Sequence, residues 1–531
     1  MMRFLPYGLV VLAWLGMLAL ALTGTPENWW IVAGLLTPLV LIGVRDMLQR
    51  AHSLQRNYPL VGHFRAAFES IRPQIRQYLM ESSTDGRPFD RGQRSLVYQR
   101  AKNVLDTVPF GTERDVREVA YEWVNHSMSP QPAAREPFRI TIGNAQCAQP
   151  YAASVFNISA MSFGSLSAAA IRALNIGAKR GGFAHDTGEG GLSPYHLENG
   201  GDLIWEVGTG YFSTRMPDGA FDPDRFRTLA AHAQVKMIEI KLSQGAKPGH
   251  GGILPAAKLT QEIAGIRGVP LGRDCVSPAG HAAFSTPTGL LEFVAQLRKL
   301  SGGKPTGFKL CVGHRWEFLG ICKAMLETGI FPDFIVVDGK EGGTGAAPVE
   351  FSDHVGTPLR EGLLFVHNAL VGCNVREHIR IGASGKIISA FDIVAAMAMG
   401  ADWCNSARGF MFALGCLQSQ KCHTNKCPVG IATQDPSRQR GLVVGEKAER
   451  VANFHGNTVE ALAELVAAAG LKHPSEIGPR HILRRVSPDR VVALDHAYAM
   501  LEPGQLLDGG TLPEQWADDW RRASATSFAG D

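Results

Sequence analysis

Two long apolar runs open the chain. Residues 4–22 contain nineteen positions without a charge, and residues 29–44 form a second uncharged run of sixteen. A helix needs roughly 20 apolar residues to span a bilayer, with about 17 as a lower limit. The first run meets this limit and the second meets it with its flanks, so we expect a transmembrane helical hairpin. A signal peptide for the first run and a pair of buried helices are the alternatives.

Charges around the two runs predict their orientation. Four arginines lie outside the pair: Arg3, Arg45, Arg50 and Arg56. The connecting loop carries only Glu27. The positive-inside rule then places both ends, and the catalytic body, on the cytoplasmic side of the cell (inner) membrane.

Residues 49–135 are rich in Arg and Gln and predict a helical, basic collar. Contact of this collar with anionic lipid is an alternative to a merely solvated surface. We expect four segments: anchor 1–48, collar 49–135, barrel 136–470 and C-terminal extension 471–531. The extension has a helical, basic pattern and no functional interpretation.

Short β-rich runs alternate with helical patterns from about residue 150. The eight predicted strands are 154–159, 181–186, 237–242, 273–277, 307–312, 333–339, 379–383 and 402–407. Such alternation is typical of a parallel sheet. Eight units over roughly 270 residues predict an α/β fold, a (β/α)8 TIM barrel. A doubly wound open sheet is the alternative. In a barrel, chemistry lies on the loops that follow the strands.

Glycine-rich loops follow most of these strands. They are "SAMSFGS" after the first, "DTGEGG" after the second, "SQGAKPGHGG" after the third, "DGKEGGTGAAP" after the sixth, "ASGK" after the seventh and "NSARG" after the eighth. Free backbone N–H groups at such loops favour a phosphate. Lys309, inside a predicted strand, is expected either beneath a flavin ring or paired with a buried carboxylate.

Composition and motifs bear on three questions: nucleic-acid binding, NAD(P)H binding and the redox state of the compartment. Lys plus Arg total 53 and Asp plus Glu total 49, so the net charge of +4 gives no argument for nucleic acid. No GxGxxG follows a strand, which argues against a Rossmann NAD(P)H site. An odd number of cysteines, nine, suits a reducing compartment.

Three of these cysteines are closely spaced in "CLQSQKCHTNKCPVG", residues 416–430. The C-x5-C-x4-C spacing fits neither a disulfide pair nor the CxxC mark of structural zinc. A zinc site that adds His423 stays an alternative, although His423 adjoins Cys422.

The glycine loops and "GCLQSQKCHTNKCPVGIATQ" together resemble the flavin domain of glutamate synthase, over about residues 135–470. The whole chain is similar to short FMN-binding glutamate synthase-related proteins. The resemblance implies a 3Fe-4S cluster held by Cys416, Cys422 and Cys427. It also implies an FMN site formed by Ser159, Ala160, Met161, Ser162, Gln244, Lys309, Gly343, Gly385, Lys386, Ala407 and Arg408.

The implied reaction adds ammonia to 2-oxoglutarate and reduces the imine to glutamate. By resemblance, Lys247 and Arg267 match positions that bind carboxylates, with Lys241 close by, and Glu189 is the carboxylate expected near the imine. Arg267 could instead be only a helix-end cap. Three positions depart from the family pattern: Leu192, His250 and Ile253.

The partners follow from what the chain lacks. Without an N-terminal cysteine or a glutaminase domain, we expect externally supplied ammonia, with electrons from ferredoxin, a separate reductase or a membrane carrier. Action on a different amino or keto acid is the alternative reaction. A membrane-tethered barrel that only binds or scaffolds is the non-catalytic alternative.

Overall fold

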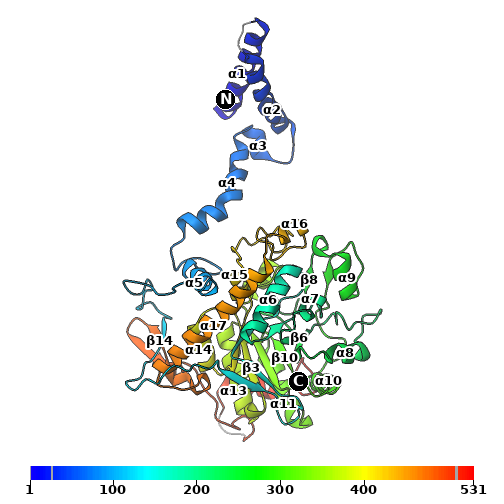
Figure 1. The fold of residues 1–531 in the computed structure, drawn as a ribbon, viewed down its shortest axis with the longest axis vertical. Helices are drawn as coiled ribbons and strands as arrows, with labels where there is room; N and C mark the ends of the chain where they lie inside the picture. The colour runs from blue at the N-terminus through cyan, green and yellow to red at the C-terminus, as the bar shows by residue number, and fades with distance from the viewer. Residues whose placement is uncertain (1, 25–27, 509–511, 531) are drawn as a thin grey trace. The chain divides into compact units, whose positions relative to one another are not determined.

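The computed structural model (Figure 1) describes residues 2–24, 28–508 and 512–530. By its internal contacts the chain divides into two units, Met1–Arg91 and Gly92–Asp531. The boundary falls inside the predicted collar, and the four-segment division stays a prediction.

The first unit begins with a helical hairpin. Helices α1 (Leu5–Leu22) and α2 (Trp29–Leu48) match the two apolar runs, and both are long and apolar enough to cross a membrane. Trp14 Nε1 donates to Thr37 Oγ1 at 2.9 Å and Tyr7 donates to the Val40 carbonyl at 3.1 Å, so polar groups are paired between the helices. Glu27 lies outside the described residues. Helices α3 (Ser53–Asn57) and α4 (Gly62–Ile75) complete this unit.

The second unit contains a closed parallel barrel, as the sequence predicts. Neighbouring strands follow the order β10-β11-β12-β13-β4-β5-β6-β7. The strands are β4 (Phe156–Ile158), β5 (His185–Asp186), β6 (Leu203–Val207), β7 (Val235–Lys241), β10 (Thr306–Leu310), β11 (Phe334–Asp338), β12 (Arg380–Ser384) and β13 (Trp403–Ser406).

One predicted strand is wrong and one barrel strand was missed. Residues 273–277 contain only the two-residue strand β9 (Cys275–Val276), which pairs antiparallel with β8 (Ile253–Leu254) outside the barrel. The third barrel strand is instead β6, wholly buried between β5 and β7. A short strand that is buried on both faces does not alternate between apolar and polar residues, so the sequence gives no period-2 signal for it. The loop "SQGAKPGHGG" therefore follows the fourth strand.

The amino-terminal end of the barrel is closed by a hairpin of β2 (Arg139–Ile142) and β3 (Tyr151–Ser154). Ile142 and Ala153 of this hairpin pack with Ile204, Phe334 and Trp403 near the strand starts in one buried apolar cluster. Chemistry is thereby restricted to the opposite end, where the strands finish.

Helices cover the outside of the barrel (Figure 1). They are α6 (Ala168–Gly181), α8 (Pro223–Ala230), α10 (Pro287–Leu300), α11 (Arg315–Thr328), α13 (Leu359–Gly372), α14 (Ala390–Ala398), α15 (Arg408–Ala413) and α17 (Val444–Ala468). The short helices α7 (Pro194–Leu197), α9 (Gln261–Arg267), α12 (Val349–His354) and α16 (Pro436–Gln439) lie in the connecting segments. The long helix α17 packs along α6 and α14. Helix α5 (Arg91–Ala101) precedes the barrel.

The carboxyl-terminal residues pack on the barrel unit. Strand β1 (Glu122–Val124) pairs with β14 (Ile482–Ser487), which pairs with β15 (Arg490–Ala493). The helical expectation was therefore wrong for this part, because the pairing partner β1 lies more than 350 residues earlier. Short helix α18 (Leu494–Ala497) and helix α19 (Glu514–Arg522) follow.

Candidate functional site

A cavity opens at the carboxyl ends of the barrel strands, with an empty volume of about 1190 Å³ that includes open solvent. Every residue expected to contact FMN lines it: Ser159, Ala160, Met161, Ser162, Gln244, Lys309, Gly343, Gly385, Lys386, Ala407 and Arg408. The loops that follow β4, β7, β11, β12 and β13 contribute most of these residues, because parallel strands end on one side of a barrel.

One part of the cavity wall is formed by glycine loops and cations. Arg408, the first residue of α15, donates to the Thr344 carbonyl at 3.3 Å. A Cβ atom at Gly343 would lie 2.4 Å from Nη2 of Arg408, so the guanidinium packs directly against bare backbone. Lys386 follows the end of β12 with a φ of 56°. Cationic side chains beside accessible backbone N–H groups are suited to bind an anionic group such as a phosphate.

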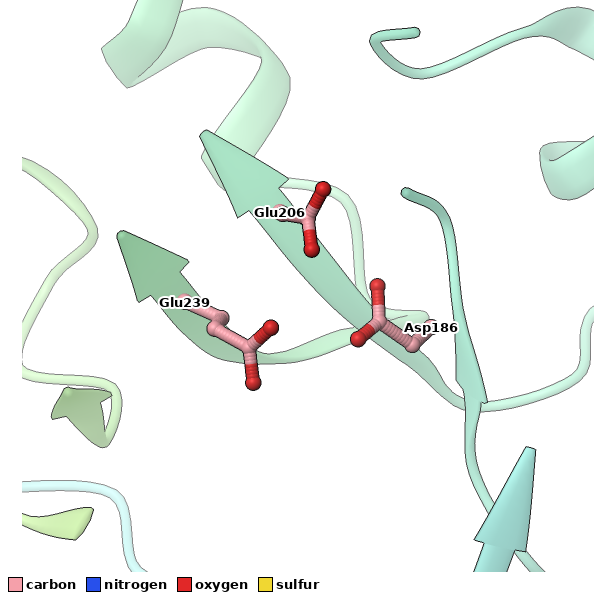
Figure 2. Close-up of side chains that lie close together, drawn as sticks. All are labelled: Asp186, Glu206 and Glu239. Atoms are coloured by element: carbon pink, nitrogen blue, oxygen red, sulfur yellow. The ribbon is translucent and has the colours of Figure 1, made fainter. Parts of the chain in front are cut away.

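The floor of the cavity is a buried charged cluster around Lys309. Its ammonium pairs with Glu206, and it lies 2.9 Å from Oε1 of Glu239. Figure 2 shows the carboxylates of Asp186, Glu206 and Glu239 converging from β5, β6 and β7; their ligand atoms lie within 4.8 Å of one another. Lys309 is therefore paired with buried carboxylates and lines the cavity, and its place beneath a flavin ring stays a prediction.

Burial and crowding shift the proton affinities of this cluster. Burial raises the pKa of Asp186 well above its ordinary value, and the neighbouring Glu239 adds to the effect. Burial also raises the pKa of Glu239 to about 7, against the opposing effect of Lys309. Burial alone would lower the pKa of Lys309, but Glu206 and Glu239 raise it well above its ordinary value. The lysine is thus held as a cation, while Asp186 and Glu239 retain protons more readily than in water.

A second charged group lies where the loops after β5 and β7 meet. Nζ of Lys241 lies 2.9 Å from Oε2 of Glu189. Burial would raise the pKa of Glu189, but Lys241, with Arg267 and Lys247, holds it below its usual range. Lys247 is 1% exposed and donates to the Ala346 carbonyl at 2.8 Å. Burial lowers the pKa of Lys247 to about 8.

Arg267 does not line the cavity. It is the last residue of α9, and its guanidinium donates to the Phe163 carbonyl at 3.2 Å and lies over the Phe212 ring. Gly268 ends the helix with a φ of 63°. Arg267 therefore supports the loop that carries Ser162, with which it forms a 3.5 Å hydrogen bond.

The three departures from the family pattern lie in different places. Ile253 lines the cavity. His250 packs edge-on against Phe351, and Leu192 is buried; in the described structure neither lines the cavity. Only the change at Ile253 therefore alters the cavity wall directly.

The cysteine loop adjoins the same cavity. Cys422 contributes to its lining, while Cys427 is buried and Cys416 is half-buried. The Gln418 amide donates to Sγ of Cys416 at 3.4 Å, and the Tyr98 hydroxyl donates to the Cys416 carbonyl at 2.6 Å.

Several contributors escaped prediction from the sequence. Glu206 lines the cavity, Glu239 pairs with the cavity-lining Lys309, and Lys258 donates to the Cys422 carbonyl at 3.3 Å. The signal for the two glutamates was present, since each is a single charge within an apolar strand, "LIWEV" or "MIEI". A fully buried carboxylate is rare unless it is paired.

Three comparisons relate the chain to known proteins. The glutamate synthase large subunit-like protein YerD of Bacillus subtilis (strain 168) is 36% identical over 513 residues, which cover 88% of this chain and 97% of that protein. The archaeal glutamate synthase (NADPH) of Methanocaldococcus jannaschii is 36% identical over 331 residues, 62% of each chain. The chain thus matches less than two thirds of that relative's length.

Among solved structures, the recombinant flavin-binding domain of baker's yeast flavocytochrome b2 aligns with 86% of this chain and 93% of its own, at 13% identity and a TM-score of 0.41. Residues 118–472 match the family described as "Conserved region in glutamate synthase". With the long match to YerD, this match shows that the chain belongs to the glutamate synthase conserved-region family.

Proposed function

We propose that this protein is an FMN- and iron–sulfur-dependent oxidoreductase that aminates a 2-oxo acid, with 2-oxoglutarate and ammonia as the first substrates to test. The observation that carries the proposal is one shared cavity. Cys422 of the three-cysteine loop, the glycine loops and the Lys241–Glu189 pair all border it.

The residues present fit FMN. Gly343, Gly385, Lys386 and Arg408 offer bare backbone and two cations for the phosphate. Ser159 to Ser162, Gln244 and Lys309 line the same cavity. The first four would form a wall for the flavin ring, and Gln244 and Lys309 would supply polar groups for its polar edge. FMN bound there would accept electrons one at a time and deliver them in pairs.

The cysteine loop fits a 3Fe-4S cluster better than a zinc ion. A tetrahedral zinc site would bring thiolates within about 4 Å of one another. Among the described residues, the group gathered within 4.8 Å is the carboxylate trio rather than the three thiols. The backbone amide directed at Cys416 Sγ suits a cluster thiolate.

In the proposed reaction each charged side chain has a role. Lys247 and Lys241 would bind substrate carboxylate, Glu189 would hold or move a proton at the imine, and Arg267 would position the Ser162 loop.

Ammonia and electrons would come from other molecules. Ammonia would arrive from outside, and electrons from ferredoxin or a separate reductase would enter through the cysteine loop. A different amino or keto acid is the second candidate, favoured by Ile253 in the cavity wall.

We also propose that the hairpin anchors the protein in the cell membrane with the barrel on the cytoplasmic side. The exposed apolar surface of α1 and α2 supports this: Leu12 is 66% exposed and Leu35 71%. Exchange of electrons with a membrane carrier would then be available as an alternative donor route. Release of the protein from membranes by alkaline carbonate would argue against the anchor.

The visible spectrum and iron content of the detergent-purified full chain test the cofactor proposal. We expect a flavin band with about three irons per chain, and loss of the iron with retention of flavin in Cys422→Ser. Cys147→Ser is the matched control, because Cys147 is a half-buried free cysteine far from the three-cysteine loop in the sequence. This variant should keep both the iron and the flavin. Flavin without iron, or zinc in place of iron, would overturn the iron–sulfur proposal, and colourless protein would favour the scaffold alternative.

A further inference from the structure

The buried carboxylates beside Lys309 outnumber the cations that contact them. Asp186, Glu206 and Glu239 place carboxylate oxygens within 4.8 Å of one another (Figure 2), and the three residues are 1%, 2% and 0% exposed. Among the described residues, Lys309 is the one cation within ion-pair distance of any of them. Full ionisation would leave two buried negative charges unbalanced, which is strongly unfavourable. We call these four residues the Lys309 cluster.

The other cations at this side of the cavity are directed at a different carboxylate. Lys241 also lies on β7 and ends that strand, but its ammonium is 2.9 Å from Oε2 of Glu189. Lys247 and Arg267 act on Glu189 as well, since both lower its pKa together with Lys241. These cations therefore balance Glu189 and do not form ion pairs with the Lys309 cluster.

The remaining carboxylates of the lining add negative charge. Asp338 on β11 and Glu341 on the following loop both line the cavity. Each accepts a hydrogen bond from a backbone amide, at 2.7 Å for Asp338 and 2.8 Å for Glu341. Asp338 also acts on Lys309. The Lys309 cluster thus has no excess of positive charge around it, and protons must supply the balance.

Protons on the carboxyl groups reduce this excess of negative charge. Burial raises the pKa of Asp186 well above its ordinary value and that of Glu239 to about 7. Interacting carboxyl groups titrate together, so a proton belongs to the cluster rather than to one residue. Oε2 of Glu239 has no hydrogen-bond partner among the described residues and is available to carry one. Glu206 and Lys309 line the cavity, so a change of charge in the cavity acts on the cluster directly.

We propose that the Lys309 cluster stores a proton, takes up a second proton from water when a negative charge forms in the cavity, and releases it when that charge leaves. This inference rests on the proposed FMN site. FMN that accepts two electrons and one proton gains one negative charge, with the electrons supplied by the ferredoxin or reductase class of donor. The second proton forms an O–H bond on a cluster carboxylate and balances that charge.

The pH dependence of the flavin midpoint potential in the full-length holoenzyme tests the proposal. For a two-electron couple, each proton taken up changes the equilibrium constant tenfold per pH unit, which is about 30 mV. Between about pH 6 and 8 we expect the slope to be steeper in wild type than in Glu239→Gln, by up to about 30 mV per pH unit. Parallel slopes in the two proteins would overturn the proposal and leave the flavin assignment standing.

Glu341→Gln is the matched control for this comparison. Glu341 is a carboxylate of the same lining, outside the trio, and glutamine keeps an oxygen that can accept the Leu359 amide. The control should retain the wild-type slope. An equal loss of slope in Glu341→Gln and Glu239→Gln would overturn the assignment to the Lys309 cluster.

Infrared spectra of the full-length protein detect the stored proton without relying on the flavin. A protonated carboxyl group has a C=O band that is separate from the bands of ionised carboxylates and shifts in D2O. This band should persist in wild type at about pH 8, far above the ordinary pKa of Asp or Glu, and weaken in Asp186→Asn. Absence of the band in wild type would overturn the stored proton. A divalent metal ion held by wild type and lost in Asp186→Asn would also overturn it. A normal band in protein that binds no flavin would support the stored proton while the proposed function fails.

Discussion

Nζ of Lys241 and Oε2 of Glu189 lie 2.9 Å apart, although 52 residues separate them in the chain. Lys241 ends β7 and Glu189 lies on the loop after β5, so closure of the barrel brings the two together. The pair is mostly buried, with the side chains 10% and 17% exposed. Lys241 therefore holds the Glu189 carboxylate ionised, with its pKa below the usual range.

Replacement of this carboxylate should abolish most of the activity. In Glu189→Gln, the shape is preserved but the proton-transfer group is lost, so we expect the amination rate to fall about 10²- to 10⁴-fold. Flavin content should change little, whereas the melting temperature should fall, because Lys241 is left mostly buried without its carboxylate. The double variant with Lys241→Met should be no worse than the slower single variant if the two residues act as one unit. Additive losses would mean separate roles.

Removal of Lys309 should destabilise the barrel. Lys309→Met leaves Glu206 and Glu239 buried without their cation, which costs about 3–5 kcal/mol. Urea unfolding followed by tryptophan fluorescence measures the loss. Adding Glu206→Gln to Lys309→Met should recover part of the stability, because a buried carboxylate that has lost its cation is removed. No recovery would show that the loss arises from packing rather than charge.

Binding of the acid substrate should weaken as the pH rises through about 8. Burial lowers the pKa of Lys247 to about 8, so its ammonium is protonated below that pH and neutral above it. A substrate carboxylate is ionised throughout this range, so the attraction exists on the acid side and is lost on the alkaline side. Flavin difference titrations between pH 6.5 and 9.5 measure the Kd. Lys247→Gln should bind more weakly with a flat profile, and a profile unchanged from wild type would exclude Lys247.

Acid should destabilise the barrel through His455. Its ring stacks on Phe183 and shares a 2.9 Å hydrogen bond with Ser154 Oγ, and burial lowers its pKa from 6.5 to about 3. The unfolded state therefore binds the proton first, and stability falls as the pH drops below about 6.5. From pH 8 to pH 5 this group alone should cost about 2 kcal/mol.

The test compares unfolding of wild type and His455→Gln across that pH range. Glutamine retains a hydrogen-bonding group without titrating, so the variant should lose less stability on acidification. A parallel loss in both proteins would assign the acid sensitivity to other buried groups. His126, an exposed histidine of the barrel unit, offers a control substitution at the surface.

Local pattern by itself determined the class of fold and the face that carries the site. The apolar runs that became α1 and α2, seven of the eight barrel strands and the glycine loops could all be read from the sequence. Strand period and turn chemistry are encoded locally, and the carboxyl ends of parallel strands must share one side. All eleven expected FMN contacts therefore line one cavity.

Tertiary structure alone decided which charges meet. Lys309 and Glu206 are 103 residues apart, and β6, which carries Glu206, gave no alternating pattern. Arg267 matched a binding position by its motif, yet α9 directs it to the Phe163 carbonyl instead of the cavity. Charge pairing depends on distances that only the closed barrel fixes, whereas helices, strands and turns depend on neighbours within a few residues.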